Sequence, residues 1–145
     1  MFINNNLILS SLLLFNVLLC QISDAIGRNG AVSSSNEYAT QVGIDILKAG
    51  GNAIDAAVAV GFALAVTHPA AGNIGGGGFM VVHLSRGEVL TLDFRETAPG
   101  LSSKDMFLNE KGEVIKGKSW KSALAVGTPG TVAGLGYAHQ KYGTQ

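Results

Sequence analysis

The chain has 145 residues, about the length of one small domain. Hydrophobic residues make up 47% and charged residues 14% of it, a composition too apolar for a disordered chain. Ten Lys and Arg residues balance ten Asp and Glu residues, and without a basic stripe or an acidic tail no nucleic-acid partner is expected.

The first 25 residues have the pattern of an export signal. The run from Leu7 to Cys20 is almost wholly Leu, Ile, Val and Phe, and it is short for a membrane span. Ser23-Asp24-Ala25 then supplies small residues at the third-last and last positions of a cleavage site, so we predict a signal peptide over residues 1–25 and a periplasmic or extracellular product. Because Met1 to Asn6 carry no Lys or Arg, an uncleaved membrane anchor is the main alternative.

Cys20 is the only cysteine, and it lies inside this predicted signal. A lipid-modified Cys20 is a further alternative, which the bulky Leu19 disfavours. Cleavage after Ala25 would leave residues 26–145 without a disulfide, a thiol nucleophile or a thiolate metal ligand. We therefore expect this part to depend on a packed core.

Two helices are predicted next. A short apolar stretch, Gly30 to Val32, is interpreted as an edge strand. The helix-capping residues Ser33-Ser34-Ser35-Asn36 follow it and predict a helix from Glu37 to Lys48, which Gly50-Gly51 ends. The second helix is predicted from Ala53 to Thr67. From Ala53 to Val66 only Asp55 is polar, which predicts a central helix covered on both sides.

A helix of this kind needs a larger partner surface than the rest of the sequence supplies. We therefore expect residues 26–145 to be the front of a longer, layered α/β domain and not to fold alone. The hairpin that follows has a buried strand, Phe79 to Leu84, and a returning strand, Glu88 to Phe94. Residues 100–122 are expected to be irregular, and a last helix is predicted from Thr131 to Tyr142.

The glycine run Gly75 to Gly78 lacks the following Gly-Lys-Ser or Gly-Lys-Thr and the helix of a phosphate-binding loop. It is interpreted as a tight turn where another backbone passes close. The three histidines lie in different elements without carboxylate or cysteine partners at metal-ligand spacing, so no metal site, cofactor or catalytic residue is predicted. They are His68, His83 and His139.

The segment Asp93-Phe94-Arg95-Glu96 is the strongest candidate for a binding site. It leaves the end of a predicted strand, where a sheet holds side chains rigidly. The planar guanidinium of Arg95 matches a carboxylate with two parallel hydrogen bonds. The residues alone nevertheless favour a local ion pair of Arg95 with Glu96 or Asp93 over a ligand contact.

Several segments, in order and spacing, closely resemble the start of bacterial gamma-glutamyltransferases. This resemblance covers nearly all of residues 26–145 and implies part of the αββα sandwich of N-terminal-nucleophile hydrolases. The matching segments are ATQVGIDILKAGGNAIDAAVAVGFALAVTHP (39–69), GNIGGGGFM (72–80), DFRETAP (93–99), DMF (105–107) and GTPGTVAG (127–134).

The resemblance also implies a function. Members of this family are exported, and one precursor cuts itself into a large and a small subunit. A threonine freed at the start of the small subunit attacks the gamma-glutamyl carbonyl of glutathione, and Arg95 would bind the alpha-carboxylate of the glutamyl group. The expected partners are therefore glutathione and the small subunit of the same precursor.

By the same resemblance, the nucleophile is expected to lie outside this chain, which alone should be inactive. Two alternatives stay open: a related exported acylase acting on cephalosporins or poly-gamma-glutamate, and a non-catalytic binding or structural protein with Arg95 in a local salt bridge. No threonine of the chain matches the nucleophile: Thr40, Thr67, Thr91, Thr97, Thr128, Thr131 and Thr144.

Overall fold

The computed structural model describes residues 26–145, so the predicted signal peptide and Cys20 lie outside the described residues. Residues up to Ala31 belong to a unit separate from Val32–Gln145, and the fold that positions the site lies in the latter. Among residues 26–145, no helix is long and apolar enough to cross a membrane.

The two predicted helices are present with the predicted bounds. Helix α2 spans Glu37–Lys48, and the side chain of Asn36 caps it by accepting hydrogen bonds from two backbone N–H groups of its first turn. Gly50 ends it with φ of 98°, in the left-handed region that glycine adopts without strain. Both boundaries follow from local capping chemistry, which explains why the sequence predicts them well.

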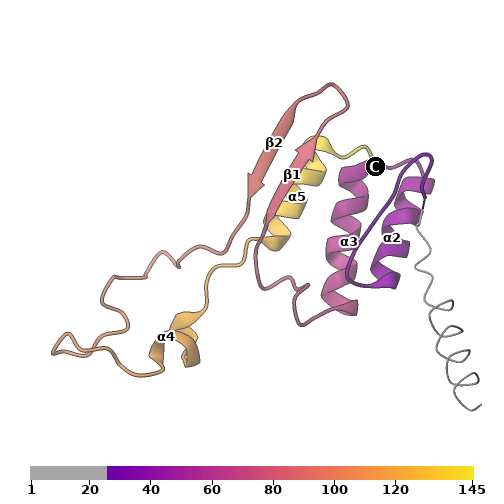
Figure 1. The fold of residues 1–145 in the computed structure, drawn as a ribbon. Helices are drawn as coiled ribbons and strands as arrows, with labels where there is room; N and C mark the ends of the chain where they lie inside the picture. Colours follow the sequence, from indigo (N-terminus) through magenta and orange to yellow (C-terminus); the bar gives the residue numbers. More distant parts are fainter. Residues whose placement is uncertain (1–25) are drawn as a thin grey trace, which may run out of the picture. The chain divides into compact units, whose positions relative to one another are not determined.

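Helix α3, Ala53–Thr67, lies between α2 and α5 (Figure 1). Glycines allow this close packing: a Cβ on Gly43 of α2 would lie 2.7 Å from a methyl of Val60, and one on Gly61 would lie 2.9 Å from Leu135 of α5. The expected cover on two sides is therefore confirmed. Burial all round is not, because Val66 near the end of α3 is largely exposed.

The hairpin consists of β1, Phe79–His83, and β2, Val89–Asp93, paired antiparallel. The prediction of a fully buried first strand is wrong. Side chains alternate between faces, and the helices cover only the face of Met80 and Val82, whereas Phe79 and Val81 on the other face are 64% and 73% exposed. Within residues 26–145, no second layer covers that face.

The predicted edge strand at Gly30 to Val32 is also wrong, since residues 30–32 form no strand. The side chain of Val32 packs against Gly43 on α2 instead of joining the hairpin. Residues 100–122 are irregular as predicted, apart from an isolated bridge between Leu108 and Val114 and the short helix α4, Lys118–Lys121. A single 3₁₀ turn, η1, follows at Ala123–Ala125.

Helix α5, Thr131–Tyr142, completes the fold and has the predicted bounds. Its residues Leu135 and Ala138 are buried and, with Ala39, Ile54 and Ala56 of the other helices, form the small core of the described part. Because α5 contacts both α3 and β2, it connects the helix layer to the strand from which Arg95 emerges.

Candidate functional site

The segment that leaves β2 is enclosed by glycines from two other parts of the chain. Gly78 and Phe94 exchange backbone hydrogen bonds of 3.3 and 3.0 Å. A Cβ on Gly77 would lie 2.5 Å from the carbonyl oxygen of Phe94, and a Cβ on Gly134 of α5 would overlap the Phe94 ring. The interpretation of the glycine run as a place of close backbone approach is confirmed, and the approaching backbone is the one that carries Arg95.

The turn before α5 holds the same segment from the other side. Thr97 and Thr128 exchange backbone hydrogen bonds of 3.2 and 2.8 Å. The carbonyl oxygen of Gly76 accepts from the N–H groups of Gly130 and Thr131, at 2.8 and 3.1 Å. The backbone on both sides of Arg95 is therefore fixed by hydrogen bonds to distant parts of the sequence.

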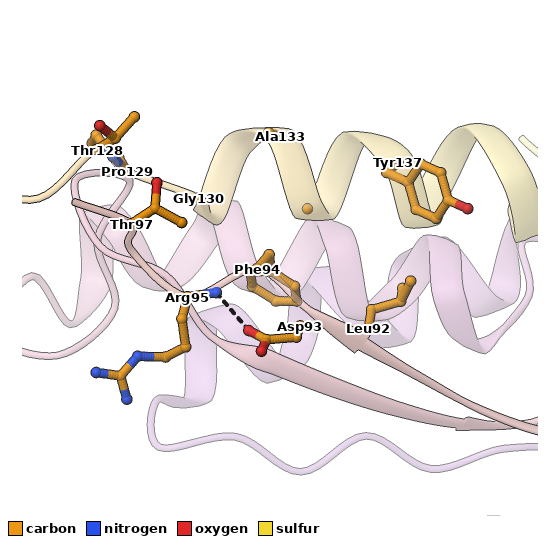
Figure 2. Close-up of a pocket in the computed structure, with 11 residues that line it drawn as sticks. Leu92, Asp93, Phe94, Arg95, Thr97, Thr128, Pro129, Gly130, Ala133 and Tyr137 are labelled. Carbon is orange, nitrogen blue, oxygen red and sulfur yellow. Dashed lines mark hydrogen bonds between the residues drawn. The ribbon is translucent and has the colours of Figure 1, made fainter. Parts of the chain in front are cut away.

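The guanidinium of Arg95 extends from this fixed backbone into solvent. Its side chain is 63% exposed, and Figure 2 shows it directed away from Thr97, Thr128 and α5. Its backbone N–H donates a 3.0 Å hydrogen bond to Asp93 Oδ1, while its guanidinium carbon lies 5.8 Å from the centre of the Phe79 ring. Within residues 26–145 only Nε of this guanidinium is paired, and its two terminal nitrogens donate no hydrogen bond, so they are available to a ligand.

The sequence-based alternative of a local ion pair is realised in part. Nε of Arg95 lies 3.2 Å from Oε2 of Glu96, whereas Asp93 bonds to the Arg95 backbone rather than to its guanidinium. A pair this exposed contributes about 0–1 kcal/mol to stability. The pair can orient the guanidinium. A contribution this small does not explain why the backbone on both sides of Arg95 is packed so tightly against glycines.

Two open pockets meet at Arg95. One, of about 360 Å³, lies between the end of β2 and the start of α5 and is lined by Asp93, Phe94 and Tyr137 among others. The second, of about 700 Å³, lies beyond Glu96 and is walled by apolar residues including Phe107 and Val126. Arg95 borders both, so a molecule in either pocket could place an anionic group against it.

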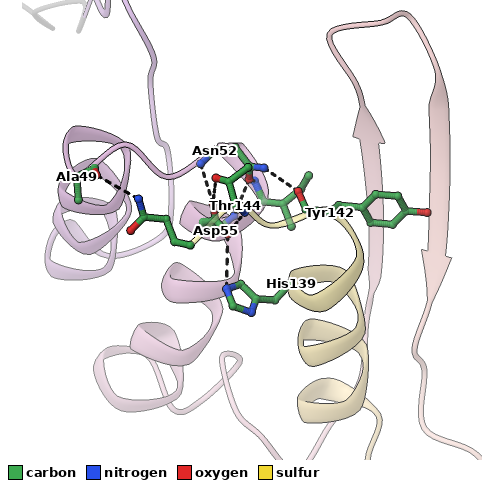
Figure 3. Close-up of polar contacts among 8 residues, drawn as sticks. Ala49, Asn52, Asp55, His139, Tyr142 and Thr144 are labelled. Carbon is green, nitrogen blue, oxygen red and sulfur yellow. Dashed lines mark hydrogen bonds and ion pairs between the residues drawn. The ribbon is translucent and has the colours of Figure 1, made fainter.

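Sequence reasoning missed a second polar cluster, drawn in Figure 3. Asp55 on α3 is 5% exposed, and its carboxylate accepts from the backbone N–H of Asn52 at 2.8 Å and from Thr144 Oγ1 at 2.7 Å. His139 Nε2 lies 3.5 Å from the same carboxylate. The signal was visible in the sequence, because Asp55 is the one charged residue in an otherwise apolar helix.

Burial alone would raise the pKa of Asp55. The backbone N–H of Asn52 and the hydroxyl and N–H of Thr144 outweigh that effect, and the net pKa is lowered from its ordinary value of 3.8. The carboxylate is therefore charged at neutral pH, as a structural anchor. Neither His68 nor His83 joins this cluster, and no group of His, Cys, Asp and Glu within residues 26–145 could hold a metal ion.

Comparison with known proteins identifies the class of protein. A sequence profile of the gamma-glutamyltranspeptidase family matches residues 39–145. The chain is 59% identical over 117 residues to the glutathione hydrolase proenzyme of Escherichia coli, covering 81% of this chain and 20% of the relative. It superposes on the gamma-glutamyltranspeptidase of Helicobacter pylori with a TM-score of 0.80 and 54% identity, covering 85% of this chain and 35% of the other.

The chain therefore belongs to the gamma-glutamyltranspeptidase family. The predicted fold class, a part of the αββα sandwich of N-terminal-nucleophile hydrolases, is confirmed by the superposition. The chain spans about a quarter or less of the length of the curated relatives it matches. A cephalosporin acylase from Bacillus halodurans is also similar, at 29% identity and a TM-score of 0.61, covering 86% of this chain and 24% of the acylase.

Proposed function

We propose that this chain forms the front of the large subunit of an exported gamma-glutamyltransferase. The enzyme would cleave the gamma-glutamyl bond of glutathione and pass the acyl group to water or to an amino acid. Membership of the family supports the reaction, and the proenzyme names of the relatives support a precursor that is processed into subunits. Identity to a glutathione hydrolase proenzyme is 59%, against 29% to a cephalosporin acylase, which favours glutathione as the donor.

The exposed, rigidly mounted guanidinium of Arg95 is the observation that carries the proposal. A planar fork of N–H donors binds a carboxylate with two parallel hydrogen bonds. We assign that role toward the alpha-carboxylate of the glutamyl group. Because glycine packing and backbone hydrogen bonds hold the segment on both sides of Arg95, the bound donor would present its gamma-carbonyl in a fixed position for attack.

The proposal divides the chemistry between subunits. The nucleophile would be a threonine at the start of the small subunit, with its own free amine as the base. Donors to the tetrahedral oxyanion would also come from outside this chain. Residues 26–145 would then contribute donor binding and orientation, with Arg95 as the residue in contact with substrate.

Residues 1–25 would direct export. Their composition is that of a signal peptide, and cleavage after Ala25 would release the mature large subunit to the periplasm or the medium. If the segment stayed attached, the same enzyme would be anchored to the membrane. Mass spectrometry of the mature N-terminus distinguishes these two products.

The deciding experiment uses the complete translated product of the gene that encodes this chain. It compares glutathione with a glutathione derivative whose glutamyl alpha-carboxylate is converted to an amide. The unaltered protein should prefer glutathione strongly, and Arg95→Ala should lose most of that preference, because the amide has no charge for the guanidinium to bind. Equal preference in the two proteins would remove Arg95 from the donor site.

The 3.2 Å pair between Arg95 and Glu96 favours one second candidate, a non-catalytic protein in which this pair is only structural. Reading the coding DNA beyond the codon for Gln145 separates the two. A long open frame that encodes a small subunit supports the enzyme, and a stop codon directly after Gln145 supports the non-catalytic protein.

A further inference from the structure

Asp55 is the one buried charged side chain among residues 26–145. One of its hydrogen bonds is local, from the N–H of Asn52, and completes the capping box of α3. The others come from residue 144, 89 positions along the chain: the N–H of Thr144 at 3.0–3.1 Å and its hydroxyl at 2.7 Å. A single carboxylate thus joins the start of α3 to the segment that follows α5.

The surrounding contacts strengthen the same junction. Asn52 Nδ2 donates a 2.7 Å hydrogen bond to the carbonyl oxygen of Tyr142, the last residue of α5. Gly143 packs so tightly that a Cβ there would lie 2.5 Å from Asp55 Oδ1 and 2.6 Å from the carbonyl oxygen of His139. The C-terminal end of α5 is therefore held in one position relative to α3.

The opposite end of α5 lies against the Arg95 segment. Gly130 and Thr131 donate to the carbonyl oxygen of Gly76, and Gly134 packs directly on the ring of Phe94, the residue before Arg95. Helix α5 has 12 residues, which at 1.5 Å per residue is about 18 Å of rigid rod. A shift or rotation at its C-terminal end is carried to Phe94, because a helix transmits displacement with little bending.

We propose that Asp55 is a positioning residue for Arg95: its carboxylate fixes α5 against α3, and α5 holds the Phe94–Arg95 backbone in the orientation that binds the donor carboxylate. The inference rests on the proposed function, since it assigns a remote support to the same site. A buried carboxylate suits this task because all of its hydrogen bonds form in only one arrangement of α3 and the segment after α5. Loss of either partner leaves buried polar groups without hydrogen bonds.

Asp55→Asn in the complete protein tests the proposal. The variant keeps the shape of the side chain, but in either orientation its amide N–H₂ faces the backbone N–H of Thr144, which lies within 3.1 Å of both carboxylate oxygens. We expect the preference for glutathione over its alpha-amide derivative to fall by about 10- to 100-fold, as small displacements at a binding group do. A change in general stability alone would lower the rates with both donors alike.

Asp45→Asn is the matched control. Asp45 lies on the exposed face of α2, where it accepts a 2.7 Å hydrogen bond from Gln41 Nε2. The same loss of one carboxylate charge there should leave the donor preference unchanged. In an Arg95→Ala background, Asp55→Asn should cause no further loss of preference, because the group that Asp55 positions is already gone.

Thr144→Val provides the answer if Asp55→Asn fails to fold. It keeps the backbone N–H bonds and removes only the 2.7 Å hydroxyl bond, so donor preference should fall in the same direction but by less. Unchanged preference in whichever variant folds would overturn the positioning role, leaving Asp55 as a purely structural anchor. Unchanged preference in Arg95→Ala would instead reject the role of Arg95 in donor binding, which is the part of the proposed function on which this inference rests.

Discussion

Nε of Arg95 lies 3.2 Å from Oε2 of Glu96, the next residue in the chain. Neighbouring side chains of opposite charge can pair wherever they are exposed, and such pairs add little stability. Here the pair sits on a backbone held by Gly77, Gly130 and Gly134, each of which leaves no room for a side chain. That much packing beneath an exposed cation is expected of a binding group and is not needed for a surface ion pair.

Arg95→Lys separates the charge of this residue from its shape. Lysine can still pair with Glu96, but it cannot form two parallel hydrogen bonds with a carboxylate. We expect Arg95→Ala to weaken donor binding by about 2–5 kcal/mol and Arg95→Lys to lose at least about 1.4 kcal/mol, or tenfold, in apparent affinity measured from steady-state kinetics.

Arg86→Ala is the control for this pair of variants. Arg86 lies in the hairpin turn, is 68% exposed against 63% for Arg95, and also pairs with a nearby glutamate, Glu88. Its loss should leave donor affinity unchanged. Near-normal affinity in Arg95→Lys would show that charge alone is sufficient at position 95 and would contradict the two-bond contact.

Gly134→Ala tests the packing of α5 on Phe94. The added Cβ would overlap the Phe94 ring, so either the ring or the helix must move. Overpacking of this kind costs about 1–3 kcal/mol. Thermal unfolding of the complete protein should therefore occur at a lower temperature.

Gly136→Ala supplies the comparison on the same helix. A Cβ on Gly136 meets nothing within 4 Å, and alanine is a better helix former than glycine by about 1 kcal/mol. This variant should be as stable as the parent or slightly more so. Equal destabilisation by both substitutions would mean that contact with Phe94 is not what constrains position 134.

Acid should release the Asp55 anchor. The pKa of Asp55 is lower in the folded protein than its ordinary value of 3.8, so the charged carboxylate stabilises the fold at neutral pH. This contribution is complete above about pH 3.8 and is lost as the pH falls through the folded-state pKa.

Melting temperatures of the complete protein between about pH 6 and pH 3 measure this contribution. The parent should lose stability more steeply at the acid end of that range than Asp55→Asn, which has no carboxylate to protonate. Parallel curves for the two proteins would show that Asp55 does not contribute to acid sensitivity.

Residues 26–145 by themselves should not unfold cooperatively. The outer face of the hairpin exposes Phe79, Val81 and Val89 at 60% or more, and Val66 of α3 is also largely exposed. Apolar surface of this extent is expected to be covered by other protein. The isolated segment should bind a hydrophobic dye and melt gradually in calorimetry. A single sharp transition would contradict this expectation.

Local chemistry explains what the sequence could predict. Helices α2 and α3 begin after Asn36 and Asn52, whose side chains cap them, and α2 ends at Gly50. These signals act within three or four residues, so a single sequence reveals them. The glycine run was interpreted correctly for the same reason, because an unusual density of glycine indicates close backbone approach.

Contacts between distant segments explain what the sequence could not. The edge strand expected at residues 30–32 is absent because Val32 packs on Gly43, a choice that depends on tertiary structure. The apolar composition of Phe79–His83 predicts a strand buried on both faces. In the structure only one face is covered by the helices, and composition alone does not indicate this. Arg95 is exposed at the end of β2, as its place directly after a predicted strand indicates. Its contact with a substrate stays a prediction.

The separation of 89 positions between Asp55 and Thr144 also imposes an order on synthesis. A ribosome adds about 5–20 residues per second, so the carboxylate is made roughly 4–18 seconds before the hydroxyl and amide that bind it. During that interval α3 can form its capping box with Asn52 but cannot dock α5. The nascent chain therefore carries an incomplete helix layer until the end of α5 emerges.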